Sequence, residues 1–198
     1  MKKLIALLMI AALVMSLAAC GNGNTEPTGT TAGQEEETTP EVQVPASAVE
    51  ILENIWALYG EDEQFYAMGG DTVTPVDNAP GAVDVTGTDF LTYNLKVPEG
   101  EIANITDAAS LIHGMLANNF TCGVYRVADA AAFAEAMRTS VLGTQWICGM
   151  PELITVAIIG GEYVLVAYGI TDAIEPFNAH LLEAYPDAQI VCNDAVVE

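Results

Sequence analysis

The chain has 198 residues, of which 27 are acidic and only five are basic, and its formal net charge is −22. A surface this acidic repels nucleic acid and anionic lipid headgroups, so the charge balance argues against a nucleic-acid-binding protein. Two interpretations stay open: a soluble, self-repelling surface domain, which is the simpler one, and a domain that binds cations or cationic ligands. No segment has the alternating Asp or Asn residues, the glycine and the terminal glutamate of a calcium-binding loop.

The amino terminus has the plan of an export signal. Two lysines precede an apolar run from Leu4 to Leu17, which leads into the sequence Leu-Ala-Ala-Cys ending at Cys20. The apolar run is shorter than the roughly 20 residues that span a bilayer, and small residues before the cut are typical of signal peptides. We therefore predict a lipoprotein signal peptide over residues 1–20, whose lipobox ends in a lipid-anchored Cys20. The alternative is an ordinary signal peptide with a chance cysteine.

A polar tether and a single domain follow the signal. Residues 21–45 are rich in Gly, Thr, Glu and Pro and cannot bury enough surface to offset their ordering entropy, so we expect them to be disordered. The remaining residues, 46–198, suffice for one extracytoplasmic domain with its own core. Cleavage of the signal removes two lysines and no acidic residue, which leaves 27 acidic residues against three basic ones, Lys96, Arg126 and Arg138.

The domain opens with a helix and an irregular segment. Ser47 and Glu50 form a capping box ahead of apolar residues at helical spacing, which predicts a helix that ends at Gly60. Residues 61–87 hold several glycines and prolines, so we predict loops, with a short hairpin as the alternative. This is the segment in which the sequence would allow a ligand-binding loop.

Two further segments precede residue 120. Residues 88–97 (TDFLTYNLKV) are predicted to be an extended segment that ends before Pro98. From Ile105 to Asn119 apolar residues recur at helical spacing, which predicts a helix with His113 at the margin of its apolar stripe.

The rest of the chain indicates the fold class. The expected elements are a strand over 120–127, a helix capped by Asp129 and ended by Gly143, a strand over 153–159, a Gly160-Gly161 turn, a strand over 162–168, a helix over 171–185 with Pro176 near its start, and a strand over 188–192. This is the split β-α-β order of ferredoxin-like sandwiches. We therefore predict an α+β fold whose antiparallel sheet carries helices on one face, with the amino-terminal helices over part of the rest. In that topology the first and last strands are neighbours.

Three passages carry a family resemblance: the lipobox at 17–20, VYRVADAAAFAEAMR at 124–138, and IGGEYVLVAYG at 159–169 followed by a helix. In these the chain resembles the uncharacterised surface lipoproteins that gut-dwelling Gram-positive bacteria carry in many copies. Those proteins share a lipobox, a Thr/Glu-rich tether and one small α+β domain of unknown function. The resemblance implies the fold class and a surface location, and it implies no activity and no catalytic residues.

Three cysteines lie in the predicted domain: Cys122, Cys148 and Cys192. An odd number leaves at least one of them free or paired between chains, and none forms a C-x-x-C motif. Their apolar neighbourhoods suit small buried side chains. If a disulfide forms, Cys122 and Cys192 are the candidates, because the predicted topology places their strands side by side.

No complete catalytic or metal-binding set is visible in the sequence. The histidines His113 and His180 lie far apart along the chain, and no G-x-S-x-G motif is present. A Cys122–His113 nucleophile pair stays open, although core packing explains both residues more simply. The cysteines and histidines are too scattered for a zinc site, and Gly160-Gly161 is expected to be a turn between strands rather than a phosphate loop. We expect neither a metal nor a cofactor.

The segment from Gln145 to Pro151 is unusually apolar for a connection between a helix and a strand. Trp146, Ile147 and Met150 are candidates for a docking patch that receives a partner or a ligand. The alternative is a loop folded over the end of the core.

The leading functional hypothesis is a membrane-anchored lipoprotein with a non-catalytic domain that binds a small molecule or a protein partner or assists an envelope process. A thiol-dependent accessory protein for secretion or redox work is the second hypothesis, and it rests on the three domain cysteines. An extracellular hydrolase is the third.

Overall fold

An eight-stranded antiparallel sheet forms the centre of the part of the chain that the computed structural model describes, residues 45–197. The predicted signal peptide, Cys20 and the tether through residue 44 lie outside the described residues. The predicted α+β class with an antiparallel sheet is confirmed. Of the helices between residues 45 and 197, none is both long and apolar enough to cross a membrane.

Three α-helices, three short helical turns and eight strands lie between residues 45 and 197. The helices are α1 (Ala48–Trp56), α2 (Ala130–Leu142) and α3 (Thr171–Ala184), with the π-helical turn η1 (Phe90–Asn94) and the 3-10 turns η2 (Glu99–Asn104) and η3 (Ala117–Asn119). The strands are β1 (Ala67–Gly69), β2 (Val76–Asp77), β3 (Gly81–Ala82), β4 (Ile105–His113), β5 (Phe120–Val127), β6 (Leu153–Ile159), β7 (Tyr163–Gly169) and β8 (Gln189–Ala195). Their order is β2-β1-β4-β5-β7-β6-β8, and β3 pairs with β4 beside this path.

The last strand takes a different place from the one predicted. β7 pairs with both β5 and β6, as the split β-α-β order requires, whereas β8 pairs with β6 and not with β5. A ferredoxin-like sandwich would bring the last strand back beside the first. The predicted ferredoxin-like order is therefore not confirmed, and β5 and β8 are not neighbours.

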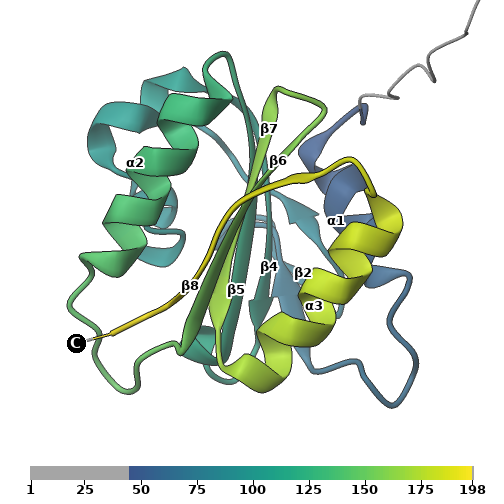
Figure 1. Ribbon diagram of the computed structural model, residues 1–198. Coiled ribbons are helices and arrows are strands. Elements are labelled where there is room, and N and C mark those ends of the chain that lie inside the picture. Colours follow the sequence, from purple (N-terminus) through teal and green to yellow (C-terminus); the bar gives the residue numbers. More distant parts are fainter. Residues whose placement is uncertain (1–44, 198) are drawn as a thin grey trace, which may run out of the picture. The chain divides into compact units, whose positions relative to one another are not determined.

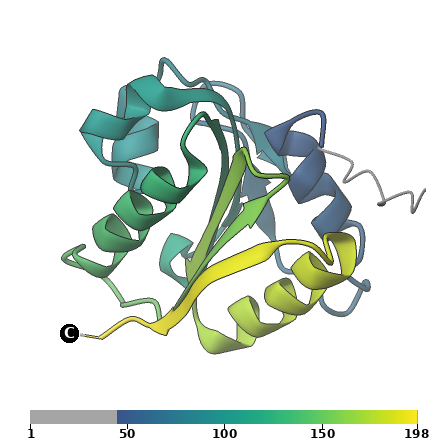
Figure 2. The same ribbon diagram turned by 45° about the horizontal axis from the view of Figure 1, so that its top comes forward.

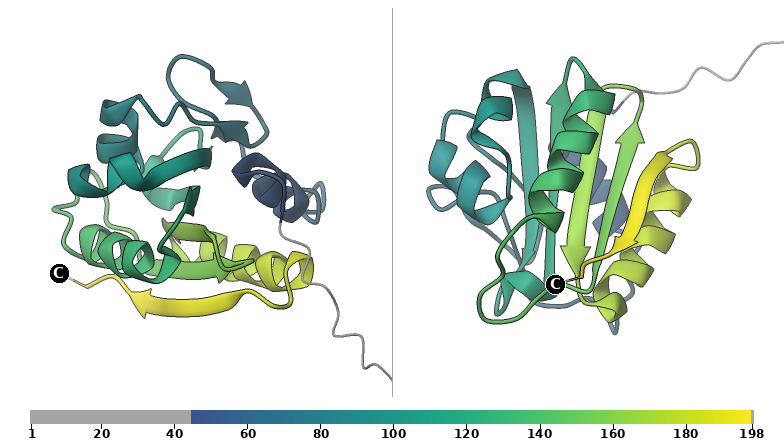
Figure 3. Two further views of the ribbon diagram at one scale, coloured as in Figure 1. Left: turned by 90° about the horizontal axis from the view of Figure 1, so that it is seen from above. Right: turned by 60° about the vertical axis from the view of Figure 1, so that its left-hand side comes forward.

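The position of β8 also decides which faces the helices cover. The crossovers β5-α2-β6 and β7-α3-β8 each step past one strand in the same direction along the sheet, but β5 and β7 are antiparallel. Right-handed crossovers of this kind place their helices on opposite faces. Figure 1 shows α2 on one side of the strands and α1 with α3 on the other, and the right-hand view of Figure 3 has α2 in front of the sheet. The expectation that the helices cover one face is wrong.

Two hydrophobic cores result, one on each face of the sheet. Every residue of β7 is buried, and its side chains divide between the two cores: Tyr163, Leu165 and Ala167 pack with α1 and α3, whereas Val164, Val166 and Tyr168 pack with α2. We call these the α1/α3 core and the α2 core. The turns η1 and η2 lie on the same side as α2 (Figure 2), and Leu91 and Leu95 of this segment belong to the α2 core.

Residues 105–119 form β4 and the connection to β5 rather than the predicted helix. The four positions from Ala108 to Leu111 are all buried, because the strand is covered on both faces. Burial at consecutive positions hides the two-residue period of a strand, so spacing alone cannot distinguish it from a helix. Met115 and Leu116, which ended the predicted stripe, are exposed.

Residues 88–97 are not extended as predicted, because they turn through η1. The sequence alternates apolar residues at Leu91, Tyr93, Leu95 and Val97, which is the pattern of a strand. In the structure Leu91, Leu95 and Val97 are buried, while the side chain of Tyr93 is 68% exposed. The four-residue spacing of Leu91 and Leu95 is the helical repeat that holds the turn against the core.

Several local predictions are confirmed. Ser47 Oγ accepts the N–H of Glu50 at 3.2 Å and caps α1, and Asp129 Oδ1 accepts the N–H of Ala132 at 3.0 Å and caps α2. Gly160 and Gly161 have φ values of 59° and 80° and form the turn between β6 and β7. The hairpin alternative within residues 61–87 also holds, since β1 and β2 pair antiparallel.

The buried carboxylate of Asp71 braces the loops that follow β1 and β3. One oxygen accepts the N–H groups of Val73 and Thr74, each at 2.8 Å, and the other accepts the N–H of Asp84 at 2.9 Å. These hydrogen bonds, above all those from the backbone of Asp84 and Thr74, lower the pKa of Asp71. The loops around residues 71 and 84 are therefore held together by one charged group.

Replacing this carboxylate should destabilise the domain in a pH-dependent way. Because the folded state lowers the pKa of Asp71, its contribution to stability is present above the unfolded-state pKa and is lost as the pH falls through the folded-state pKa. We expect Asp71→Asn to lower the free energy of unfolding by about 1–3 kcal/mol near neutral pH, and the difference from the parent to shrink below about pH 4. Urea denaturation at both pH values measures it, with the exposed Asp187→Asn as control. A difference that does not depend on pH would contradict the assignment.

Candidate functional site

The cysteines and histidines that the sequence singles out do not meet in one site. Cys122 lies in the α1/α3 core and Cys192 in the α2 core, so the two thiols are on opposite faces of the sheet as well as on separated strands. The strand adjacency on which a Cys122–Cys192 disulfide depends is absent. The three cysteines of the described domain are free, and Cys148 is the exposed one.

The chemistry of a thiol nucleophile is disfavoured at both buried cysteines. Burial raises the pKa of the Cys122 thiol, and burial followed by the charge of Asp194 raises the pKa of the Cys192 thiol. A protonated thiol is a poor nucleophile. The Sγ atom of Cys122 contacts the backbone carbonyl of Gly123 at 4.0 Å, so its contact is with the backbone rather than with an imidazole.

His113 is a structural residue at the end of β4. Its Nδ1 accepts the N–H groups of Met115 and Leu116 at 3.1 and 3.3 Å, which places the ring proton on Nε2. The ring stacks on Phe65, with centroids 5.3 Å apart and planes 6° from parallel. His180, on α3, packs against the ring of Tyr59 at 4.5 Å. The two histidines therefore flank one aromatic cluster but do not face each other as an acid–base pair.

The predicted docking patch is divided by the fold. Trp146 packs into the α2 core, where its ring lies 5.3 Å from that of Tyr168 and under the ammonium group of Lys96. Ile147 is 78% exposed and Met150 is partly exposed. The loop-over-core alternative therefore describes Trp146, and the exposed part of the candidate is limited to its two aliphatic neighbours.

Metal ligands do not gather in the described domain. Within residues 45–197, no three His, Cys, Asp or Glu side chains lie close enough together to hold a metal ion.

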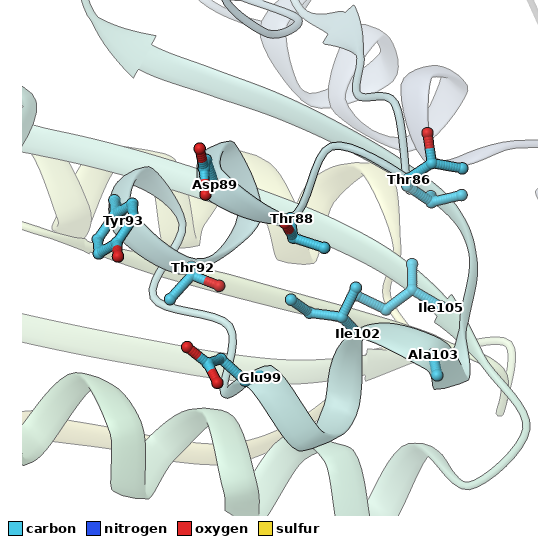
Figure 4. Close-up of a pocket in the computed structure, with 10 residues that line it drawn as sticks. Thr86, Thr88, Asp89, Thr92, Tyr93, Glu99, Ile102, Ala103 and Ile105 are labelled. Carbon is cyan, nitrogen blue, oxygen red and sulfur yellow. The ribbon is translucent and has the colours of Figure 1, made fainter.

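A groove of about 620 Å³ lies beside η1 and η2, and we call it the threonine groove. Three threonine hydroxyls, two carboxylates and one phenol surround an apolar floor. Its lining residues are Val85, Thr86, Thr88, Asp89, Thr92, Tyr93, Glu99, Ile102, Ala103 and Ile105. Figure 4 shows Tyr93, Thr92 and Glu99 at one end of the groove, Thr86 and Ile105 at the other, and Thr88 and Ile102 between the two ends.

The walls of the threonine groove are fixed to the core. The hydroxyl of Tyr168 donates to the carbonyl of Asn94 at 2.8 Å, and the hydroxyl of Ser140 donates to the carbonyl of Lys96 at 2.6 Å. Lys96 itself has a φ of 61°, a left-handed conformation that non-glycine residues rarely adopt. A strained backbone and a π-helical turn persist only where the surrounding structure holds them, and both are frequent at functional sites.

A second hollow of about 340 Å³ lies between the segment after α1 and the first turns of α3, and we call it the Tyr59 pocket. It combines aromatic rings with carboxylates. Its lining residues are Tyr59, Glu63, Phe65, His113, Asn119, Ile170, Asp172, Ala173 and Pro176. Glu63 is held in place by the N–H of Gly60, which donates to its carboxylate at 3.0 Å.

The phenol of Tyr59 is the most confined polar group of this pocket. The residue is 7% exposed, and its hydroxyl has no hydrogen-bond partner among the described residues. Burial raises the pKa of Tyr59, and nearby Cys122 and Glu63 raise it further. The sequence pattern placed Tyr59 on an apolar helix stripe and gave no signal of a pocket.

No sequence motif predicts most of the residues that line the two hollows. Residues 88–97 were predicted to be extended, and in a strand Thr88 and Thr92 would share one face. In the structure Thr92 of η1 and the threonines of the loop before it line a groove whose other side comes from Glu99 and Ile102 of η2, and the spacing of the threonines does not predict this pairing of segments. The nearest sequence signal was the Gly- and Pro-rich segment 61–87, which contributes residues to both hollows.

Thiol accessibility tests this placement of the cysteines. All described contacts lie within residues 45–197, so a chain that begins at Gly21 keeps them and carries only the three domain thiols. We expect one thiol to react in the native protein, that of Cys148, and three after denaturation, because Cys122 and Cys192 are buried. A thiol-reactive chromogenic reagent counts them, and Cys148→Ser should abolish the native reaction. A single thiol after denaturation would reveal a disulfide and contradict the structure.

Comparison of the chain with protein-family models, with curated proteins and with solved structures finds no match.

Proposed function

We propose that this chain is a membrane-anchored extracytoplasmic lipoprotein whose α+β domain is a non-catalytic binding module. The observation that carries the proposal is the threonine groove, a fixed hollow with an apolar floor and a rim of hydroxyl and carboxylate groups. Its volume lies within the roughly 300–1,000 Å³ of small-molecule sites. The signal and the lipobox of residues 1–20 support the anchored location, and the resemblance to surface lipoproteins agrees with it.

The polar groups of the groove favour a neutral polyhydroxylated ligand, such as a short oligosaccharide. Thr88 and Thr92 supply hydroxyls that both donate and accept, and Asp89 and Glu99 accept from ligand hydroxyls. The hydroxyl of Thr86 donates to Asp84 Oδ1 at 2.7 Å and offers the ligand an acceptor. The same two carboxylates repel anionic ligands. The exposed ring of Tyr93 offers an apolar face against which a sugar ring can pack.

The two alternatives have weaker support. A thiol-dependent accessory protein needs a reactive thiol, and two of the three domain cysteines are buried with a raised pKa. Only Cys148 is exposed, and a lone surface thiol is a weak basis for redox work. A hydrolase needs a nucleophile beside a base, and the atoms of Cys122 and His113 that would serve have backbone partners instead.

Removal of the exposed ring should weaken sugar binding. We expect Tyr93→Ala to lower the affinity for the best-binding oligosaccharide about tenfold, equivalent to about 1.4 kcal/mol, because the stacking surface is lost. Titration calorimetry with cello-, xylo-, malto- and chito-oligosaccharides measures the affinity. Tyr66→Ala is the matched control, since Tyr66 is also largely exposed but does not line the groove. Failure of every oligosaccharide to bind, or an equal loss with Tyr66→Ala, would exclude this ligand class.

The anchor is tested separately in cells. We expect Cys20→Ser to release the protein from the membrane fraction or block its signal cleavage, and to abolish its labelling by radioactive palmitate, because the thiol is the predicted site of lipid attachment. Cys148→Ser is the control and should leave labelling unchanged. Palmitate incorporation that survives Cys20→Ser would contradict the lipobox.

A further inference from the structure

We propose that the Tyr59 pocket is a second binding site, which takes a small organic cation with a protonated amine. This goes beyond the proposed function, because the pocket lies on the α1/α3 side of the sheet and shares no residue with the threonine groove. Three features favour this ligand class: the hydrogen-bonding groups of the pocket, its aromatic walls and the negative charge of the domain.

The first support is the unpartnered phenol. Tyr59 lines the pocket, and its hydroxyl is shielded from solvent and finds no partner within residues 45–197. A buried hydroxyl without a partner is costly, and such groups are rare in folded proteins. A ligand N–H that donates to the Tyr59 oxygen satisfies this group.

The second support is an excess of hydrogen-bond acceptors around the pocket. Glu63 and Asp172 bring two carboxylates to its wall. Pro176 is the sixth residue of α3 and has no N–H, so it cannot make the helical hydrogen bond to the carbonyl of Asp172. The helix therefore leaves the carbonyl of Asp172 without its usual donor. A ligand rich in donors matches these groups.

The third support is the lack of a Lys or Arg partner for the carboxylates of the pocket. The domain has three basic residues, and each is engaged away from the pocket. Arg126 pairs with Glu162, Arg138 pairs with Asp194, and Lys96 donates to the carbonyl of Tyr93 and lies over Trp146. The carboxylates of the pocket therefore have no Lys or Arg partner from the described residues. Glu63 lies 3.7 Å from the imidazole Nε2 of His180, and a ligand ammonium group can supply a permanent positive charge.

The aromatic walls favour the same chemistry. Tyr59 and Phe65 line the pocket with ring centroids 6.4 Å apart and planes at 90°, and Trp56 packs behind both at 4.8 and 5.2 Å. An ammonium group is attracted to aromatic ring faces, and the interaction strengthens where water is excluded. The strongly acidic surface raises the local concentration of small cations and speeds their approach.

The amine is tested by titration calorimetry with putrescine, with 1,4-butanediol as the neutral analogue of the same length and with succinate as the anionic one. The protein is the chain from Gly21, at low ionic strength. We expect putrescine to bind at least about tenfold more tightly than either analogue. Nα-acetyl-lysine amide serves as a further arm, because its binding in preference to putrescine would assign the amine to a lysine side chain rather than to a free metabolite. Equal binding of butanediol and putrescine would overturn the proposal.

Matched variants separate the pocket from the general acidity of the surface. Glu63→Gln and Asp172→Asn should each weaken putrescine binding at least about tenfold, because each removes a carboxylate from the wall. Glu175→Gln makes the same charge change on an exposed residue of α3 outside the pocket and should leave binding unchanged. An equal effect of Glu175→Gln would show that the acidic surface as a whole, rather than the pocket, attracts the amine, and it would contradict the proposal.

Tyr59→Phe should change stability and ligand affinity in opposite senses, which a substitution at an ordinary core residue would not do. In the ligand-free protein the phenylalanine removes an unsatisfied hydroxyl, so we expect the melting temperature to rise, whereas putrescine affinity should fall. A lower melting temperature would show that the hydroxyl already has a partner in the protein, and the pocket would lose its unpartnered group. Threonine-groove variants such as Tyr93→Ala should leave putrescine binding unchanged, so the failure of either proposal is distinguishable from that of the other.

Discussion

Burial of the central strands on both faces is the constraint on which the rest of this domain depends. β7 is buried at every residue, and its alternate side chains enter two different cores. A sheet of this kind must be covered on each side, since an uncovered face would leave a large apolar surface in water. The edge position of β8 meets this requirement, because it sends α3 to the face opposite α2. The two cores then fix the positions of all the segments that surround the hollows.

Both hollows lie where irregular segments, rather than long helices, complete the cover of the sheet. On the α2 side, η1 and η2 lie beside the helix and leave the threonine groove between them. On the other side, the residues after α1 meet the first turns of α3 and leave the Tyr59 pocket. Such segments have freer backbone geometry than helices and can present several side chains of one kind to the same space. Their anchoring by buried leucines and by Tyr168 keeps that geometry fixed.

The extreme charge has a structural consequence beyond solubility. With three basic residues in the domain, most carboxylates among residues 45–197 have no Lys or Arg partner, and the arginines and the lysine are held by partners of their own. Buried acidic groups are instead satisfied by backbone N–H donors, as Asp71 is. The carboxylates that line the two hollows have no Lys or Arg partner among the described residues, although Glu63 accepts the N–H of Gly60 and lies near the imidazole of His180. The charge balance therefore bears on ligand choice, because it disfavours anions and favours neutral or cationic molecules.

The sequence by itself determined the features that depend on neighbours along the chain. Caps at Ser47 and Asp129, the glycine turn before β7 and the bounds of β6 all follow from local hydrogen bonding and periodicity. Tertiary structure decided what depends on burial from two sides: β4 was mistaken for a helix because apolar residues occupy both of its faces, and the place of β8 has no local signal. The same limit applies to the sites. The threonines of the groove and the hydroxyl of Tyr59 acquire their roles only when distant segments close around them, and spacing along the chain carries no record of that contact.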